Sequence, residues 1–479
     1  MMNTTVNVTA AVAVFVLFPA LALGAPVKGE VNEFTAPSGL NEQCIRIEPF
    51  PGAHYSKHDL KREKGYCQLD MYQLALCPKL WSTSPGTILY EIDADSFGGD
   101  VGQFEKQHCA SGHHAKAAAL DKVASFKSSV NDRDTSATYA PSSWVYYHLS
   151  RFLDTNTQVP VAVYRSMDAS EHHNRVVLPA LDITAGHRNL RMLAAGWRFL
   201  DQVESGGGSA ASARAALTDE KRQVFGVMLD NKGDRYGPEF NGTRESGWGV
   251  GQNLDFQQTA PFLALRSALP VEEAAKQAIH DARKNPRMAT KLPADTPLTQ
   301  VIFWMQDVAE IALLDYVLGQ QDRIGNIDFS WRWYWLDEGR LESSAAHGTT
   351  PPDSMKPFQP VRLRRSAIND NDAGVRRGYA NFAKKSGMLD GLRHYPPGLY
   401  QKLGRLVADL AADGPARTWL VESAGLSSKE AAAIATRATE AFSKLKSDCE
   451  SGALKLDIDL HAALGGNQAG PTSCGTGSP

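Results

Sequence analysis

Apolar residues recur with a helical period from Leu298 to Gly319, and this is the strongest helical pattern in the chain. Val301, Trp304 and Val308 are among the residues that repeat on one face. A short polar loop follows, and residues 327–335 then alternate between apolar and polar types as a strand does. The pattern therefore predicts a long helix, a polar loop and a strand in direct succession.

Similar patterns predict the elements on either side. Alternation and short apolar runs predict strands over 87–93, 123–129, 159–165 and 224–230, and the last is expected to form a hairpin together with residues 231–236. Helical periodicity predicts helices over 141–153, 187–204, 271–284, 400–410 and 428–447. Strands with one helix therefore come first in the chain, and helices dominate from residue 186 onward.

Length and composition restrict the class of protein. The chain of 479 residues can form about two to three domain-sized cores or one large two-lobed domain. Its 50 Lys and Arg residues nearly balance 53 Asp and Glu residues, so the charge gives no indication of nucleic-acid binding. A hydrophobic fraction of 43% is ordinary for a folded globular protein.

Residues 1–25 have the pattern of a secretory signal peptide. Ala10 to Ala22 is almost wholly apolar, and small residues follow before Lys28. The segment before this run lacks Lys and Arg, and an uncleaved anchor is the alternative interpretation. However, the run is shorter than the roughly 20 residues that a membrane span needs. We therefore expect a secreted or periplasmic protein with no membrane span in the mature chain.

The cysteines fit the same oxidising compartment. None has the spacing of a zinc motif, so disulfide bonds are the better interpretation. Six cysteines allow about 15 pairings, and the sequence does not choose among them. The six are Cys44, Cys67, Cys77, Cys109, Cys449 and Cys474.

These patterns divide the chain into five expected segments. After the signal peptide, residues 26–85 are rich in turns and cysteines and are expected to form a disulfide-stapled N-terminal extension. Residues 86–185 would form a β-rich lobe, and residues 186–462 a larger and mainly helical lobe. Residues 463–479 are rich in Gly, Ser and Thr and are expected to be a flexible tail.

The loop after the strongest helix carries the most informative chemistry. It contains Asp322, Arg323 and Asn326. A carboxylate there can accept the proton of an attacking hydroxyl, and an amide can hold a metal ion without adding charge. A second acidic turn, residues 369–374 (NDNDAG), can hold a divalent cation. Together the two turns indicate a site for phosphate transfer.

Four motifs resemble those of the atypical kinases related to phosphatidylinositol 3-/4-kinases, HipA-type kinases and secretory-pathway kinases of the Golgi casein kinase type. Phe126-Lys127 resembles the nucleotide-contacting lysine of the third strand, and residues 143–151 resemble the helix that follows. Residues 321–326 (QDRIGN) resemble the catalytic loop, and residues 367–374 resemble the metal loop. The resemblance covers residues 87–410 thinly.

The resemblance implies an α+β protein with a two-lobed, protein-kinase-like fold. It implies that Asp322 is the catalytic base or orienting carboxylate and that Arg323 braces the loop. Asn326 would hold Mg²⁺ or Mn²⁺ together with Asp370 or Asp372, and the choice between these two stays open.

The nucleotide side of the site is expected to involve the first lobe. Lys127 would contact the phosphates of ATP and neutralise their charge. Gly98 and Gly99 follow the first predicted strand and would form a phosphate cover. The implied partners are therefore a nucleotide and an acceptor with a hydroxyl group.

This sequence departs from the family pattern in two places. The helix position expected to carry Glu is Ser143, so the usual partner of Lys127 is missing there. In addition, Asn326 follows Asp322 by four residues rather than the usual five. Other acidic residues that can substitute for the helix Glu are Glu91, Glu105, Asp132 and Asp134.

The expected function is ATP-dependent phosphate transfer to a protein or small-molecule hydroxyl. The missing Glu leaves a pseudokinase, or a transferase of another part of the nucleotide, as an alternative on the same fold. A non-catalytic extracellular binding protein is an alternative of a different class.

Two further motifs are not expected to carry a function. Residues 246–252 (SGWGVGQ) are dense in glycine, but no predicted strand precedes them, so a phosphate loop is not expected. Asn241-Gly-Thr243 matches a glycosylation sequon, which has meaning only in a eukaryotic secretory pathway and also arises by chance.

Overall fold

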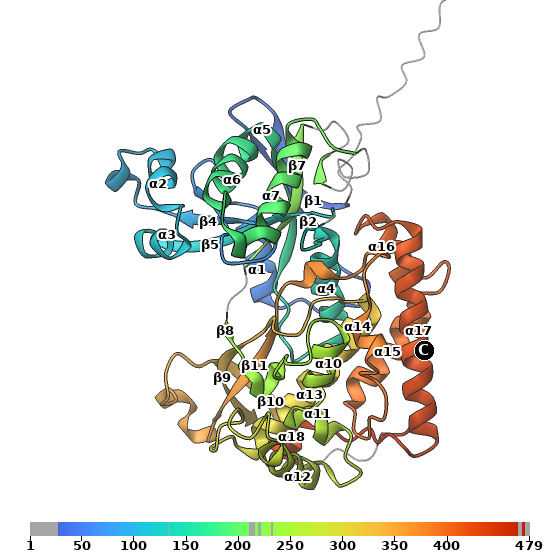
Figure 1. Cartoon of the computed structure of the whole chain (residues 1–479). Coiled ribbons are helices and arrows are strands. Elements are labelled where there is room, and N and C mark those ends of the chain that lie inside the picture. The colour runs from blue at the N-terminus through green and yellow to red at the C-terminus, as the bar shows by residue number, and fades with distance from the viewer. Residues whose placement is uncertain are drawn as a thin grey trace, which may run out of the picture.

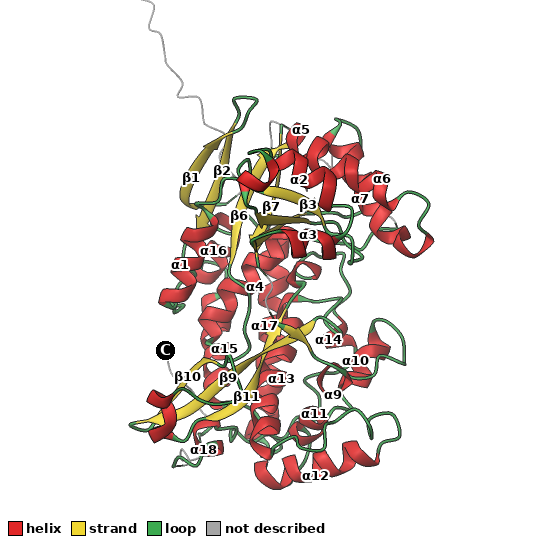
Figure 2. Cartoon of the chain, turned by 90° about the vertical axis from the view of Figure 1, so that its left-hand side faces the viewer, coloured by secondary structure: helices red, strands yellow, loops and turns green. Residues whose placement is uncertain are grey.

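The computed structural model describes residues 27–132, 134–209, 216–218, 222–230, 233–467 and 472–474. The segment expected to be a signal peptide lies outside these residues. The protein belongs to the α+β class, which confirms that part of the prediction. Its strands form two antiparallel sheets, one in the upper and one in the lower part of the molecule (Figure 1, Figure 2).

The upper sheet has seven strands in the order β1-β2-β6-β7-β5-β4-β3, and its neighbouring strands are antiparallel. The inner strands consist mostly of buried side chains, which explains their nearly continuous apolar runs. The strands are β1 (Gly29–Thr35), β2 (Asn41–Ile47), β3 (Ala75–Pro78), β4 (Thr87–Glu91), β5 (Asp121–Ser128), β6 (Ala162–Asp168) and β7 (Gln223–Leu229).

The upper sheet confirms the strands predicted over 87–93, 123–129, 159–165 and 224–230. The hairpin predicted over 224–236 is wrong, because β7 pairs with β5 and β6. Residues 26–85, expected to be an extension, supply β1, β2 and β3 to the same sheet.

The lower sheet is formed by β9 with β10 and β11 on its two sides, and β8 also pairs with β9. Residues 341–360 contain most of β10 and a 3₁₀ turn. The strands are β8 (Asp234–Arg235), β9 (Ile327–Asp337), β10 (Arg340–Ala345) and β11 (Val361–Ile368).

Helix α13 (Leu298–Leu318) is the central helix of the lower part. Nearly all of its side chains are buried, because it packs against β11 and against several helices at once. The helices around it include α11 (Ala260–Leu265), α12 (Val271–Lys284) and α17 (Ser428–Glu450). Among the described residues, no helix is both long enough and apolar enough to cross a membrane.

Helix α4 (Ala140–Leu153) joins the two parts of the molecule. It contacts β6 and β7 above and α13 and α15 below (Figure 1). Almost all of its side chains are buried, including that of Ser143. This burial on every side follows from its position between the upper sheet and the lower helices.

The remaining helical elements cover the two sheets or connect their strands. In the upper part they are α1 (Lys57–Tyr66), η1 (Ala94–Phe97), α2 (Val101–His108), α3 (Gly112–Ala118), α5 (Ala169–His172), η2 (His173–Val177), α6 (Leu178–Thr184), η3 (Arg188–Leu190) and α7 (Arg191–Glu204). In the lower part they are α9 (Pro238–Asn241), α10 (Val250–Phe256), η4 (Asp353–Phe358), η5 (Asn371–Ala373), α14 (Phe382–Lys385), α15 (Pro397–Asp409), α16 (Pro415–Glu422) and α18 (Leu460–Ala463).

All six cysteines form disulfide bonds, which is consistent with a secreted protein. The pairs are Cys44–Cys67, Cys77–Cys109 and Cys449–Cys474. The last pair ties the expected flexible tail to α17.

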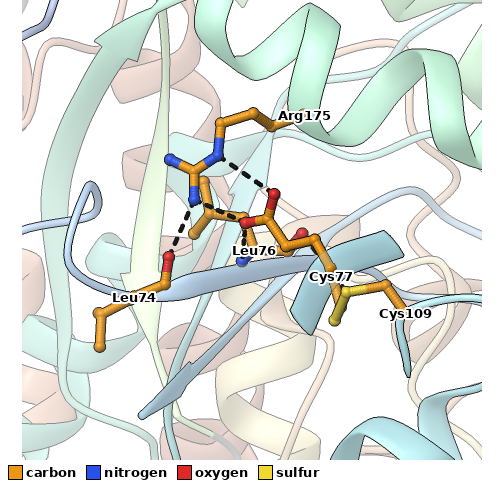
Figure 3. The surroundings of a disulfide bond; sticks show 6 residues. Leu74, Leu76, Cys77, Cys109 and Arg175 are labelled. Carbon is orange, nitrogen blue, oxygen red and sulfur yellow. Dashed lines mark hydrogen bonds and ion pairs between the residues drawn. A yellow bond between two sulfur atoms is a disulfide. The ribbon is translucent and has the colours of Figure 1, made fainter. Parts of the chain in front are cut away.

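The bond between Cys77 and Cys109 fixes α2 to β3 and lies beside Arg175 (Figure 3). Arg175 donates to the backbone oxygen of Leu74 and forms an ion pair with Glu105. Glu105 also accepts a hydrogen bond from the backbone N–H of Leu76 in β3 at 2.7 Å, so Glu105 and the disulfide hold the same strand. Because Glu105 pairs with Arg175, it does not act as the acidic partner of Lys127.

Candidate functional site

Four of the eight predicted site residues line a cavity of about 680 Å³. Its upper wall is formed by Lys79 and residues 81–84, in the turn between β3 and β4, and by residues 135–138 before α4. Its lower wall includes the loop after α13 and the turn after β11. The volume is in the range of about 300–1,000 Å³ that is typical of small-molecule sites.

The loop after α13 places Asp322 in the cavity wall. Gly319 ends the helix with a left-handed backbone (φ 71°), a conformation that glycine adopts without strain. The side-chain oxygen of Gln320 then accepts hydrogen bonds from the backbone N–H groups of Gln321 and Asp322, both at 3.0 Å. This turn fixes the backbone from which the Asp322 carboxylate projects.

Arg323 lies beneath the loop and is only 2% exposed. Its guanidinium forms an ion pair with Asp315 of α13 at 3.0 Å. It also donates to the backbone oxygen of Asn369 and to the side-chain oxygen of Asn371. Arg323 thereby links α13, the Asp322 loop and the acidic turn after β11.

The acidic turn holds Lys127 from two sides. The Nζ atom of Lys127 lies 2.7 Å from Oδ1 of Asp370 and 3.3 Å from Oδ2 of Asp372. Burial would lower the pKa of Lys127, but the two carboxylates outweigh burial and raise it. Burial would raise the pKa of Asp370, but the charges of Lys127 and Lys79 hold it well below its usual range. Lys127 and Asp370 are therefore both charged at neutral pH.

Lys79 lines the cavity itself. It follows β3 directly, and its backbone N–H donates to Gly86 across the turn. Burial and the nearby charge of Lys127 lower the pKa of Lys79 to about 8, even though Asp370 and Asp372 act in the opposite direction. Lys79 therefore loses its charge within the range of ordinary assay conditions.

The Asp322 carboxylate accepts a hydrogen bond from the indole N–H of Trp248 at 3.2 Å. Burial raises the pKa of Asp322. The charges of Asp370 and Asp372 also raise it, whereas the Trp248 hydrogen bond lowers it. A carboxylate with a raised pKa, in a cavity, has the properties of a general base.

Asn326 is held in place at both ends of its amide. Its Nδ2 donates to the backbone oxygen of Asp322 at 2.9 Å, and its Oδ1 accepts from Arg235 at 3.0 Å. The Nε atom of Arg235 also contacts Asp328 at 2.6 Å. The oxygen expected to bind a metal ion therefore already has a cationic partner.

The fit of a divalent cation depends on the carboxylate oxygens of Asp370 and Asp372 that do not contact Lys127. The bonds to Lys127 use neither Oδ2 of Asp370 nor Oδ1 of Asp372, so each residue keeps one carboxylate oxygen outside them. Two carboxylates together with substrate phosphates are a common Mg²⁺ ligand set. Within the described part of the chain, no group of three or more His, Cys, Asp or Glu residues has the arrangement of a metal site. The fit therefore depends on ligand oxygens from a bound phosphate.

Asn241 supports the loop from below. It is 3% exposed, and its Nδ2 donates to the backbone oxygens of Tyr236 and Ile327. Its Oδ1 accepts from the backbone N–H of Gly325 at 3.0 Å. The sequon is therefore a chance match in the folded protein, because the amide nitrogen that would carry a glycan is buried and bonded.

The structure thus brings together most of the predicted residues. Asp322, Asn326, Asp370 and Asp372 line the cavity, and Lys127 contacts the last two. Lys127 forms these ion pairs in place of the one expected with an acidic residue at position 143.

Gly98 and Gly99 are not among the residues that line the cavity. They lie between η1 and α2, where both have left-handed backbones (φ 62° and 77°). The β3–β4 turn, with Ser82, Thr83 and Ser84, instead lies over the cavity.

Several cavity residues were not identified from the sequence. Lys79 and residues 81–84 were assigned to the N-terminal extension, although Ser, Pro and Gly between two apolar runs are typical of a hairpin turn. Trp248 and Gln252 come from the glycine-dense run, and Arg235 and Arg244 flank α9. The Nε2 of Gln252 is buried and has no hydrogen-bond partner among the described residues.

No protein-family model and no curated protein matches the chain.

Proposed function

We propose that the chain has a two-lobed, kinase-like fold and transfers phosphate from ATP to a hydroxyl group, as a secreted or periplasmic enzyme. The observation that carries this proposal is the shared location of Asp322, Asp370 and Asp372 at one cavity, with Lys127 bonded to two of them. These are the residue types that phosphate transfer requires: a base, metal-binding carboxylates and a lysine for the phosphates.

The order of the upper sheet supports the proposal. From the β3 edge, the strands run β3, β4, β5, β7 and β6, and Lys127 lies on the third of them. Helix α4 follows that strand and leads to β6. The nucleotide lysine of protein kinases also lies on the third strand and precedes a helix.

The turn between β3 and β4 supports a nucleotide position beneath it. Protein kinases cover the phosphates with a glycine-rich loop in this part of the sheet. Here the turn is rich in hydroxyl groups, with Ser82, Thr83 and Ser84. Together with Lys79, this turn would supply hydrogen-bond donors for the phosphates of ATP. From the sequence, this role was expected of Gly98 and Gly99.

In the proposed reaction, Asp322 orients the acceptor hydroxyl and takes its proton. Lys127 and Lys79 neutralise charge on the phosphates. Asp370 and Asp372 would hold Mg²⁺ or Mn²⁺, which supplies further positive charge to the phosphates when bound. Arg323 holds the Asp322 loop and the acidic turn in fixed positions relative to each other.

Titration calorimetry with ATP and Mn²⁺ on the oxidised protein tests the nucleotide site directly. We expect saturable binding, followed by transfer that depends on an added hydroxyl acceptor. Binding without transfer would support the pseudokinase alternative. No heat at millimolar ATP would reject both nucleotide functions and leave the extracellular binding protein.

Replacing Lys79 by methionine is expected to weaken ATP binding about 10-fold or more at pH 7, because one charged contact to phosphate is lost. In the native protein, ATP affinity should fall as the pH rises through about 8, because Lys79 then loses its proton. Calorimetry between pH 7 and pH 9 measures both effects.

The Lys79→Met variant should lack the affinity change near pH 8. Lys276→Met is the matched control, because Lys276 is exposed on α12 and does not line the cavity. An identical pH profile in the Lys79 variant would remove Lys79 from the nucleotide site.

Replacing Trp248 by phenylalanine is expected to shift the acid limb of the transfer rate to higher pH. Transfer needs the Asp322 carboxylate, so the rate falls as the pH falls through its pKa. The Trp248 hydrogen bond stabilises that carboxylate, and its loss raises the pKa of Asp322 further. The shift should be about one pH unit, the lower end of the roughly 1–2 units that correspond to the free energy of a hydrogen bond to a charged group.

A pH–rate profile of Trp248→Phe, with Trp335→Phe as control, measures this shift. Trp335 is partly exposed on β9 and does not line the cavity. An acid limb that stays in place or moves to lower pH would show that the indole does not act on Asp322.

A further inference from the structure

Arg235 occupies a position next to the Asp322 loop that neither the sequence nor the proposed function assigned. It lies on β8, at the junction of the upper and lower parts of the molecule (Figure 1). Its side chain is about half exposed (51%) and lines the cavity. A ligand in the cavity can therefore reach its guanidinium.

The contacts of Arg235 coincide with one of the expected metal ligands. Its Nη1 donates to Oδ1 of Asn326 at 3.0 Å, and its Nε contacts Oδ1 of Asp328 at 2.6 Å. Protein kinases use two Mg²⁺ ions, of which one is held by the asparagine of the catalytic loop. In this protein the corresponding amide oxygen faces a guanidinium.

The other contacts of Asn326 show that this orientation of the amide is fixed. Its Nδ2 is used by the backbone oxygen of Asp322, so Oδ1 must face the other way, towards Arg235. Burial raises the pKa of Asp328, and the charge of Arg235 opposes this effect. The charge of Arg235 therefore offsets the negative charge of Asp328, next to the amide oxygen where a metal ion was expected.

A guanidinium is well suited to this substitution. It stays charged at every accessible pH and carries five N–H donors in a planar fork. The contacts to Asn326 and Asp328 use only Nη1 and Nε, so further N–H groups remain for phosphate oxygens. Two cations at one amide oxygen would repel each other, so Arg235 and a metal ion exclude one another there.

We propose that Arg235 replaces the second metal ion of this kinase-like site, so that ATP binds with a single divalent cation, held by Asp370 and Asp372. The inference rests on the proposed function and adds the number of metal ions and a cationic residue that contacts phosphate. Asn326 then acts by positioning Asp322 rather than by binding metal.

The bonds formed and broken in the transfer step are the same with this arrangement. The acceptor oxygen forms a bond to the γ-phosphorus, and the bond from that phosphorus to the β–γ bridging oxygen breaks. The hydroxyl proton passes to Asp322, and the products are ADP and a phosphate ester. Arg235 stays bound to Asn326 and contributes charge without transferring a proton.

Counting bound Mn²⁺ tests the inference independently of turnover. The oxidised protein is saturated with a non-hydrolysable ATP analogue and titrated with Mn²⁺, and bound Mn²⁺ is measured by electron paramagnetic resonance. We expect one Mn²⁺ per native protein and two in Arg235→Ala, in which Asn326 is free to bind metal. Asn326→Ala should still bind one, and the Arg235→Ala/Asn326→Ala double variant should return to one.

Arg340→Ala is the matched control, since Arg340 is exposed on β10 and does not line the cavity. Thermal unfolding of each variant establishes that it is folded. Two Mn²⁺ ions in the native protein, or one in Arg235→Ala, would overturn the inference. Failure of the ATP analogue to bind is a separate readout by calorimetry, and it would instead reject the proposed function.

Discussion

Replacing Asp322 by asparagine is expected to lower the rate of phosphate transfer at least about 100-fold, the lower range for the loss of general-base catalysis. Asparagine keeps the size of the side chain and can still accept the Trp248 hydrogen bond, so the loop should keep its shape. ATP affinity should therefore change little. Measurement of kcat together with calorimetry of ATP binding separates the two effects.

Asp353→Asn is the matched control for this variant. Asp353 is highly exposed, forms an ion pair with Lys356 three residues away, and does not line the cavity. Its transfer rate should equal that of the native protein. If Asp322→Asn also retained full turnover, Asp322 would have no part in the reaction.

Replacing Arg323 by methionine is expected to lower the free energy of unfolding by about 3–5 kcal/mol, because it leaves a buried charge without its partner. Arg323 and Asp315 are 2% and 1% exposed, and the ion pair between them joins α13 to the site. Urea unfolding at pH 7 measures the loss. The exposed Arg340→Met should change stability by about 0.5 kcal/mol or less.

The pH dependence of the Arg323→Met variant gives a second measurement. Burial already raises the pKa of Asp315, and the removal of Arg323 raises it further. An acid whose pKa is raised by folding stabilises the folded state at low pH and loses that contribution as the pH rises. The stability deficit should therefore be smaller near pH 5 than at pH 7. It should also shrink in the Asp315→Asn/Arg323→Met double variant, where no buried charge remains. A deficit that is the same in both variants and at both pH values would mean that the ion pair is not its cause.

The elements that matched prediction have strong local patterns. The helix over 298–319 and the strand over 327–335 were confirmed as α13 and β9. Their apolar residues repeat with the period of the element, because one face or both faces are buried in the core. Strands β1 to β3 were missed, because their short runs lie among turns and cysteines that favour an irregular interpretation.

The pairing of strands was less predictable than their existence. β7 ends close to β8 in sequence, and a hairpin was the simplest interpretation. In the structure β7 pairs with β5 and β6, whereas β8 pairs with β9. A strand pattern shows which side chains can be buried, but the partner depends on contacts with residues far along the chain.

The residues of the candidate site also divide into those that a short segment predicts and those that only the fold brings together. The acidic and amide residues of the two turns were found from residue type and spacing within short segments. Lys79, Arg235 and Trp248 were not, since each comes from a segment that is separate in sequence. The contact between Asn326 and Arg235 also joins residues 91 positions apart, so the sequence alone does not indicate it.

The sequence by itself determined the long helix, the polar loop with Asp322, the acidic turn and the strand that carries Lys127. These features depend on residue type and local period, which a single segment contains. Only the tertiary structure decided that Lys127 pairs with Asp370, 243 positions away, and that Arg235 faces Asn326. Such contacts depend on how the two sheets and α13 pack around one cavity, and this packing is a property of the whole chain.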